Sequence, residues 1–246
     1  MTEPRTAIAS HRGGAFLWPE NSMTAFRATA GLALEQVECD VHASADGDAV
    51  VMHDATLDRT TDGSGPVAAL PTSAVTRLRV RGCAGGTVPL LGEMLDVYRG
   101  TAIAPRIEVK GDTDGRPYRG LVPRVMAALD QSGLRRKSWV IAFDAGTAAE
   151  AQAAGGLAGV AWLMEGRTYA SLGIRGAIAV TKAYGFPEIG LPQSVLDAEG
   201  CAAFQGAGIR VSVWGANHEA SIRRMLGLGI ECLTTDDPPL AIALRG

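Results

Sequence analysis

The feature that most constrains the fold is the regular alternation of short apolar runs with helix-like stretches along the chain. Nine runs of five to seven residues are typical of strands. They are Thr6–Ser10, Gln36–His42, Ala49–His53, Pro105–Lys110, Trp139–Phe143, Gly159–Met164, Ala177–Thr181, Ile209–Trp214 and Glu231–Thr235. Strands that alternate with helices favour βαβ units and a parallel sheet, so we expect an α/β fold.

Two neighbouring runs are an exception to the parallel pattern. Only about half a dozen residues, with the turn sequence Ala45-Asp46-Gly47-Asp48, separate Val41-His42 from Val50-Val51. A parallel crossover needs about a dozen residues or more, so these runs predict an antiparallel hairpin. Eight parallel strands remain, which predicts a (β/α)₈ TIM barrel, and the length of 246 residues matches the roughly 250 residues of that fold.

The barrel is expected to be a single domain, residues 1–246, with a small insertion at its C-terminal mouth. The insertion would cover about residues 45–100, including the hairpin return and the turn-rich segment Ala55–Gly86. Asn21 or Ser22 is expected to cap the helix that follows the first strand.

Charge, hydropathy and cysteine usage exclude several classes of protein. The formal net charge of −3 argues against a nucleic-acid partner, because phosphate backbones require clustered Lys and Arg. No stretch approaches about 18 apolar residues and the N-terminus lacks an apolar signal-peptide core, so we expect no membrane span and no leader. The four cysteines form no C-x-x-C pair, which indicates neither a zinc site nor a redox motif and predicts a reducing compartment and a cytoplasmic protein. Cys39 and Cys232 lie in strand-like runs and are expected to be small core residues.

Ionisable residues gather at the ends of the expected strands, where a barrel of this kind places its chemistry. Glu38 and Asp40 lie two residues apart and therefore point to one face of their strand, and Glu108 and Lys110 repeat this spacing on the next barrel strand. Three carboxylates that converge in the mouth repel one another, and a hard divalent cation removes that cost. The alternative is an ion pair in which Lys110 neutralises Glu38 or Glu108 without a metal.

Two histidines, His11 and His53, follow strands at the same rim, and each is flanked by a charged residue. Phosphoryl transfer requires a base for the nucleophile and an acid for the leaving oxygen, and imidazole suits both near neutral pH. His42 faces the same side as Asp40 and is interpreted as a spare, whereas His218 is expected at the surface or at a helix cap.

A series of short motifs occurs in a fixed order along the chain. The motifs are His11-Arg12-Gly13, Pro19-Glu20-Asn21, Glu38-x-Asp40-Val41, Asp46-Gly47 followed by His53-Asp54, Thr60-Thr61-x-Gly63-x-Gly65, Glu108-x-Lys110 and Thr235-Asp236-x-Pro238. In type and order they resemble the glycerophosphodiester phosphodiesterase family, one of the phosphatidylinositol-phospholipase-C-like phosphodiesterase barrels. One such motif would be weak, but the whole series, from about Ile8 to Pro238, is specific.

The resemblance implies a role for each group of site residues. The metal ligands would be Glu38, Asp40 and Glu108. The acid–base pair would be His11 and His53. The phosphate- and substrate-binding residues would be Arg12, Lys110 and Trp214, and the supporting residues would be Glu20, Asn21 and Asp54. The metal would be Mg²⁺ or Ca²⁺, with Mn²⁺ also possible.

The chain departs from the family pattern at three places. Ser22 replaces the common Thr after Glu-Asn, which is a mild change. Trp214-Gly215-Ala216-Asn217 stands where the family usually has Trp-Thr-Val-Asn, and Ala142-Phe143-Asp144 lacks the frequent Ser before Phe. The last two lie at the rim, so they bear on the identity of the alcohol that leaves and not on the chemistry.

The activity that the resemblance implies is metal-dependent hydrolysis of a glycerophosphodiester to sn-glycerol 3-phosphate and an alcohol, within lipid and glycerol metabolism. We expect the substrate's own glycerol hydroxyl to attack, giving a cyclic phosphate that water opens, with direct attack by water as the rival. The partner would be a small molecule, without stable membrane association, because no Trp- or Leu-rich loop marks an apolar rim. The oligomeric state stays open.

Three other functions compete with this interpretation. A phospholipase D-like or cyclising phosphodiesterase would act on lipid headgroups from the same barrel. A catalytically silent barrel would only bind phosphorylated ligands, which the intact histidines, carboxylates and lysine argue against. A sugar-phosphate isomerase or aldolase would need a Schiff-base lysine or a carbonyl-polarising set, for which no residues are evident.

Overall fold

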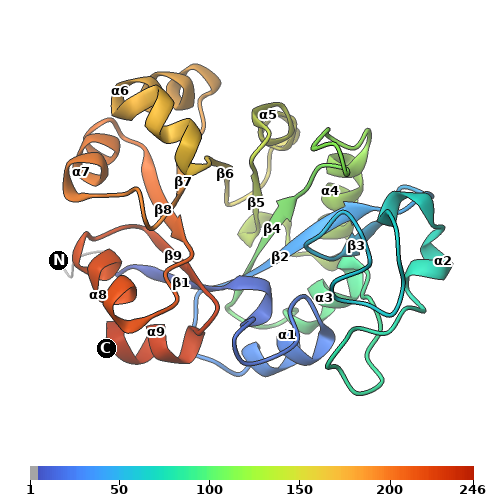
Figure 1. Cartoon of the computed structure of the whole chain (residues 1–246). Coiled ribbons are helices and arrows are strands. Elements are labelled where there is room, and N and C mark those ends of the chain that lie inside the picture. Colours follow the sequence, from blue (N-terminus) through green and yellow to red (C-terminus); the bar gives the residue numbers. More distant parts are fainter. Residues whose placement is uncertain (1–4) are drawn as a thin grey trace.

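The computed structural model describes residues 5–246, and in that range eight parallel strands form a closed barrel with one antiparallel strand added at its rim (Figure 1). The ring closes because β1 pairs with β2 as well as with β9. The strands are β1 Ala7–Ser10, β2 Gln36–Ala43, β3 Ala49–Val51, β4 Ala104–Val109, β5 Trp139–Ala142, β6 Gly159–Leu163, β7 Glu188–Pro192, β8 Arg210–Trp214 and β9 Cys232–Thr235. The predicted TIM barrel is therefore confirmed.

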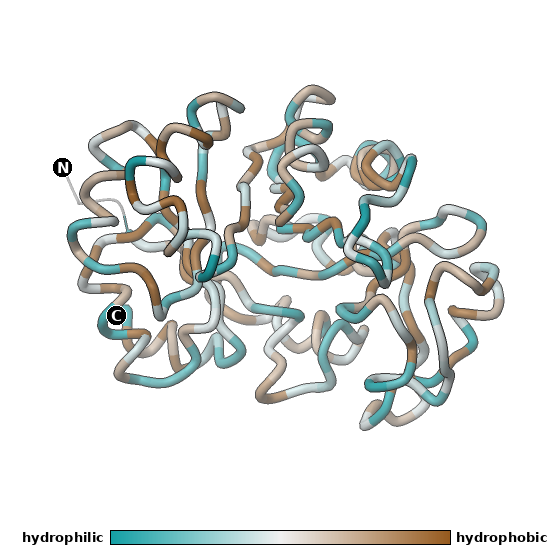
Figure 2. The backbone as a smooth tube through the Cα atoms, turned by 45° about the horizontal axis from the view of Figure 1, so that its top comes forward, coloured by the Kyte–Doolittle hydropathy of each residue, from teal (hydrophilic) through white to brown (hydrophobic). Residues whose placement is uncertain are grey.

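Helices connect the strands and surround the barrel (Figure 1). They are α1 Met23–Thr29, α2 Thr72–Val75, α3 Leu91–Val97, α4 Leu121–Ser132, α5 Ala145–Ala154, α6 Gly166–Tyr184, α7 Ala198–Gly206, α8 Glu219–Gly227 and α9 Pro238–Arg245. Both brown and teal segments occur in the helices of Figure 2, as expected for helices that pack one face on the strands. Within residues 5–246, no helix has the length and apolarity needed to cross a membrane.

One predicted strand is wrong. The run Ala177–Thr181 lies inside α6, and the strand at that point of the barrel is β7. A five-residue apolar run cannot be told from a buried turn of helix by its periodicity. Gly190 and Pro192, both disfavoured in strands, concealed β7. The number of parallel strands was predicted correctly because one error replaced the other.

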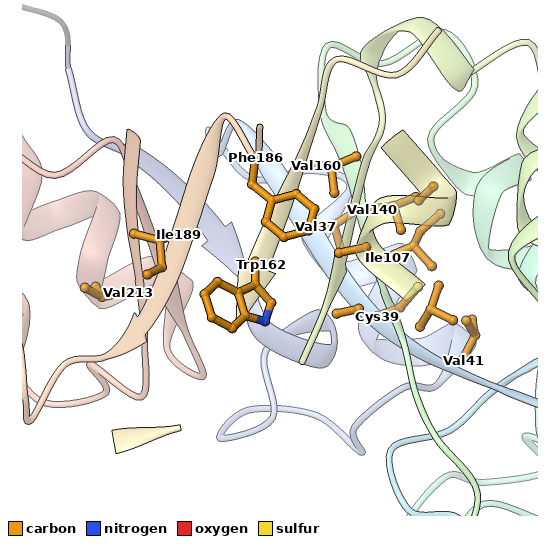
Figure 3. Close-up of a cluster of buried hydrophobic side chains, with 14 of the residues drawn as sticks. Val37, Cys39, Val41, Ile107, Val140, Val160, Trp162, Phe186, Ile189 and Val213 are labelled. Atoms are coloured by element: carbon orange, nitrogen blue, oxygen red, sulfur yellow. The ribbon is translucent and has the colours of Figure 1, made fainter. Parts of the chain in front are cut away.

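Alternation along the strands divides their side chains between two environments. Those that point outward pack against the helices in the main core, where Figure 3 shows Val37, Cys39 and Val41 beside Ile107. Those that point inward fill the barrel. On its β5–β6 side the interior is apolar, through Ile141, Ala161 and Leu163. The four cysteines are free and buried, which confirms the prediction of core positions for Cys39 and Cys232.

The barrel floor is closed by a buried ion pair. Arg106 of β4 donates to Glu188 of β7 over 2.5 Å, and both residues are at most 1% exposed. The guanidinium groups of Arg106 and Arg210 lie 5.4 and 5.3 Å from the ring centroid of Trp139. This polar layer beneath the mouth was not anticipated from the sequence.

The predicted hairpin is present, with Val41 opposite Val51 in an antiparallel register. The segment that follows has its own small core, formed by Val50, Met52, Leu57, Val67, Val75, Val80, Cys83 and Val88. Helix α3 falls within the predicted insertion of residues 45–100 but packs against α1 and α4, as a barrel helix does. The small core of the insertion therefore covers fewer residues than 45–100 and ends near Leu90.

Candidate active site

The carboxyl ends of the strands surround a cavity of about 620 Å³ at the barrel mouth. Its lining includes seven of the predicted site residues, namely His11, Arg12, Glu38, His53, Glu108, Lys110 and Trp214. The other four, Glu20, Asn21, Asp40 and Asp54, contact members of that lining. The structure thus brings together residues that are as far apart in sequence as positions 11 and 214.

Three buried carboxylates form the centre of the site. Glu38, Asp40 and Glu108 each place one oxygen within 4.8 Å of the others, and Asp40 lies opposite Glu108 in the parallel register of β2 and β4. Glu38 is 1% exposed and Asp40 is fully buried. In residues 5–246, Glu38 Oε1 has no hydrogen-bond partner although it is buried. A buried, unpartnered carboxylate oxygen beside two further carboxylates fits a hard divalent cation.

Two cationic side chains adjoin the carboxylates. Lys110 Nζ lies 2.6 Å from Glu108 Oε1 and 3.1 Å from Asp40 Oδ1. Arg12 Nε lies 3.4 Å from Asp40 Oδ2. The ion pair that the sequence offered as an alternative therefore exists, but it leaves Glu38 outside. Two cations match only two of the three carboxylates, so the third can ionise only against repulsion and burial, a cost that a divalent ion would remove.

The pKa is raised for two of the three carboxylates and lowered for the third. Burial, followed by repulsion from Asp40, raises the pKa of Glu38 to about 8. Burial also raises the pKa of Glu108. Burial alone would do the same to Asp40, but Lys110, His53, Arg12 and His11 together outweigh it and hold the pKa of that carboxyl well below its usual range. In the absence of an ion, Asp40 is therefore charged while Glu38 retains a proton near neutral pH.

His11 is held by a motif residue to which the sequence analysis assigned no role. It begins a short 3-10 turn after β1, and its Nδ1 lies 2.6 Å from Asp236 Oδ1. Asn217 fixes Asp236, donating to its carboxylate over 2.5 Å and accepting its backbone N–H over 2.9 Å. Burial lowers the pKa of His11, but the hydrogen bond to Asp236, together with the negative charges of Glu38 and Asp236, outweighs it and the net effect is a rise. Asp236 and Asn217 both follow strand ends and lie in motifs named from the sequence, but the sequence assigned neither of them a role.

His53 has a matching partner at the opposite side of the site. Its Nδ1 lies 2.6 Å from Asp54 Oδ1. The interpretation of His42 as a spare is not supported, because both of its ring nitrogens are engaged. His42 Nε2 donates to the backbone oxygen of His53 over 2.9 Å, so Nδ1 accepts from the Tyr118 hydroxyl over 3.0 Å. His218 occupies the N-cap position of α8, as expected.

Residues of the loop after β1 form hydrogen bonds with side chains of the site. Asn21 has a left-handed backbone, with φ of 53°, and its side-chain amide donates to Asp40 Oδ2 over 2.8 Å. It is Ser22 that caps α1, by accepting the backbone N–H of Ala25. Glu20 accepts from Arg12 Nη1 over 3.1 Å. The Pro-Glu-Asn motif thus reaches one metal-ligand candidate and one phosphate-binding candidate.

Apolar side chains line the cavity on the side of β5, β6 and β8. They are Ile141, Phe143, Leu163 and Trp214, and the acidic residues Asp144 and Glu165 also line the cavity there. Phe143 meets Trp214 edge to face, with ring centroids 6.1 Å apart. Among the described residues, the buried indole Nε1 of Trp214 has no hydrogen-bond partner. The cavity therefore offers charged groups and apolar surface together, as a small ligand with a phosphate and a carbon chain would require.

The expectation of no apolar rim is wrong. Phe16 is 54% exposed and Leu17 is 44% exposed, and Trp18 follows them in the loop after β1. The backbone N–H of Phe16 bonds to Asp236, the partner of His11, so this loop adjoins the mouth. One Phe-Leu-Trp triplet was too short to stand out in the sequence.

Comparison with known proteins adds independent findings. Residues 11–240 match the model of the "Glycerophosphoryl diester phosphodiesterase family". A similar curated protein is a glycerophosphodiester phosphodiesterase from Caldanaerobacter subterraneus subsp. tengcongensis, 24% identical over 245 residues, with 98% of each chain covered.

Solved structures resemble the chain over its whole length. One is a protein from Agrobacterium tumefaciens with a provisional assignment as a glycerophosphoryl diester phosphodiesterase. It is 36% identical, has a TM-score of 0.95 and is aligned over 98% of this chain and 97% of its own. Another is an Oleispira antarctica phosphodiesterase in complex with the product sn-glycerol-3-phosphate. It is 21% identical, has a TM-score of 0.83 and is aligned over 98% and 96% of the two chains.

Proposed function

Because the chain belongs to the glycerophosphoryl diester phosphodiesterase family, and is thus a phosphoric diester hydrolase, we propose that it hydrolyses a glycerophosphodiester to sn-glycerol 3-phosphate and an alcohol with a divalent cation and two acid–base histidines. The observation that carries this proposal is the trio of buried carboxylates in a cavity that two carboxylate-bound histidines also line. The Oleispira phosphodiesterase holds the same product on the same fold, which supports it.

The residues that would hold the cation are Glu38, Asp40 and Glu108, and Mg²⁺, Ca²⁺ or Mn²⁺ suits their oxygen donors. When bound, the ion would neutralise charge on the phosphate. Arg12 and Lys110 border the trio and would bind phosphate oxygens that the cation leaves free.

The two histidines would move the protons. In each ring Nδ1 faces an aspartate, so it carries a proton, and Nε2 is the nitrogen left to exchange one with substrate. One imidazole takes the proton of the attacking hydroxyl, and the other gives a proton to the departing alcohol oxygen. The aspartates fix the tautomer and the ring orientation that both transfers need.

The nucleophile that we propose is the 2-hydroxyl of the substrate's own glycerol. It is tethered to the phosphorus, so its attack avoids much of the entropy cost of positioning free water, an advantage of up to about 7–11 kcal/mol in favourable cases. The product is a five-membered cyclic phosphate, which water then opens. An analogue without the 2-hydroxyl should therefore turn over slower by several orders of magnitude. A rate near that of the parent would establish direct attack by water instead.

The activity itself is tested with glycerophosphocholine, glycerophosphoethanolamine and glycerophosphoinositol. Metal-free protein is assayed with Mg²⁺, Ca²⁺ or Mn²⁺, and phosphorus NMR identifies the products. We expect sn-glycerol 3-phosphate in the presence of at least one ion, and none in excess EDTA. Full activity in excess EDTA would contradict the proposed role of the metal. Absence of turnover with all three glycerophosphodiesters would contradict the proposed substrate class.

The exposed loop favours one second candidate, a phosphodiesterase that acts on lipid headgroups at a surface. Phe16 and Leu17 adjoin the mouth and would enter the interfacial layer of a lipid aggregate. In that case Phe16→Ser with Leu17→Ser would lower binding to lysophosphatidylcholine vesicles and their hydrolysis, but not the hydrolysis of glycerophosphocholine. Equal loss on both substrates, or on neither, would speak against the lipid function. A cytoplasmic location stays a prediction.

A further inference from the structure

The segment that follows His53 carries an arginine, Arg59, that forms hydrogen bonds with residues of two separate loops at the mouth. Arg59 donates to Asp54 from Nε over 2.7 Å and from Nη2 over 2.9 Å. It also donates to Glu20 from Nη1 and from Nη2, each over 2.8 Å. Four hydrogen bonds to two carboxylates use the planar fork of a guanidinium in full, which lysine cannot imitate.

Each carboxylate leads to a residue of the site. Asp54 is hydrogen-bonded to Nδ1 of His53, and Glu20 accepts a hydrogen bond from a second arginine, Arg12, over 3.1 Å. A continuous chain of charged contacts thus runs from Arg12 through Glu20, Arg59 and Asp54 to His53. Its two ends line one cavity, although 41 positions separate them in the sequence.

The backbone that presents Arg59 is itself anchored. Leu57 and Thr61, on either side of it, are both fully buried. Thr61 Oγ1 donates to the backbone oxygen of Leu57 over 2.7 Å and accepts the N–H of Gly63 over 3.0 Å. A Cβ at Gly63 would lie 2.6 Å from a terminal methyl group of Leu78, so the glycine lets that side chain pack against the segment without shifting. The Thr60-Thr61-x-Gly63 motif has no role in the proposed chemistry, and it therefore serves to fix the backbone position of Arg59.

We propose that Arg59 is a positioning residue that clamps the two loops of the mouth and thereby fixes the ring of His53 and the guanidinium of Arg12 for the reaction. Without it, Asp54, which is 27% exposed, turns to solvent and no longer holds the His53 tautomer. Glu20 likewise loses the partner that keeps it against Arg12. Arg59 itself contacts neither histidine, so it acts only through these carboxylates.

The clamp makes a prediction that a merely structural ion pair does not. Arg59→Ala should lower kcat by about 10–100-fold and also raise KM, because one end of the chain serves proton transfer and the other serves phosphate binding. Arg59→Lys keeps the charge, but the single ammonium nitrogen has three donors and cannot form the four hydrogen bonds of the planar fork, so it should fail to restore kcat. The control is Arg79→Ala, which breaks an exposed pair with Asp62 in the same insertion. It should leave both constants unchanged.

This test rests on the proposed function, so a second readout does not depend on activity. The chain has four histidines, and a His53→Gln spectrum identifies the ring signals of His53 in long-range ¹H–¹⁵N NMR. At about pH 9 with Mg²⁺ present, imidazole is ordinarily neutral, and the wild type should show the proton on Nδ1. Arg59→Ala should shift His53 toward the other tautomer, whereas Arg79→Ala should not.

The outcomes separate the two proposals. If no glycerophosphodiester is turned over by the wild type, the proposed substrate class fails and NMR alone decides the clamp. If the wild type is active, wild-type kcat in Arg59→Lys overturns the clamp. An unchanged His53 spectrum in folded Arg59→Ala overturns it in either case.

Discussion

Replacement of Glu38 by glutamine should make the metal-free protein more stable, and increasingly so as the pH rises. The substitution keeps the size of the side chain, and an amide oxygen can still accept the backbone N–H of Arg12 that Glu38 accepts over 2.9 Å. What it removes is the cost of ionising a buried carboxyl beside Asp40 and Glu108.

The sign and size follow from the pKa of Glu38, which is raised from an ordinary 4.5 to about 8 by burial and by Asp40. Between these values the folded state binds more protons than the unfolded state, so the stability of the wild type falls as pH rises. Below about pH 4.5 the cost is absent, and above about pH 8 it is complete. At about 1.36 kcal/mol per pKa unit, it reaches about 5 kcal/mol at most, or about 10–20 °C in Tm for a chain of this size.

The assay is thermal unfolding in excess EDTA from about pH 5 to pH 9, on the wild type, Glu38→Gln and the control Glu150→Gln. Glu150 is an exposed residue of α5, so its replacement should leave the pH profile of the wild type unchanged. Addition of Mg²⁺ should raise the Tm of the wild type at high pH much more than that of Glu38→Gln, because the ion offsets the repulsion. If the Tm of the wild type and of Glu38→Gln changed in parallel with pH in EDTA, the argument would be refuted that a cation relieves repulsion among these carboxylates.

Three further substitutions test other parts of the molecule. Lys110→Met should raise KM and lower kcat together, because the ammonium faces the phosphate in the ground state and in the transition state; an unaltered kcat/KM would place Lys110 outside the site. Asp236→Asn should lower kcat by about 10–100-fold through the lost orientation of His11, and steady-state kinetics at saturating substrate would detect it; an unchanged kcat would show that His11 needs no such partner. Arg106→Met should cost about 3–5 kcal/mol in urea unfolding, because it leaves Glu188 buried without its closest cation; a loss below about 1 kcal/mol would contradict this.

The local features of the site could be predicted from the sequence because they depend on short-range geometry. The period of two along a strand places Glu38 and Asp40 on one face, whatever the rest of the chain does. The short connection between Val41 and Val50 excludes a parallel crossover, so the hairpin followed from chain length alone. Resemblance to a family then supplied roles that no spacing implies.

Tertiary structure decided what depends on packing and on the reach of side chains. The run Ala177–Thr181 is apolar enough for a strand, but its place in the barrel belongs to β7, whose Gly190 and Pro192 conceal it. Local pattern does not distinguish the two, because burial against neighbours decides whether a short apolar run is helix or strand.

The long-range pairings within the site were also beyond the sequence. Asp236 reaches His11 across 225 positions, and Arg59 reaches Glu20 across 39. A carboxylate or guanidinium shows in the sequence that it can form such bonds, but not with which residue, since closure of the barrel sets which strand ends become neighbours. The sequence thus determined which chemical groups the mouth contains, and the closed ring of strands determined which of them touch.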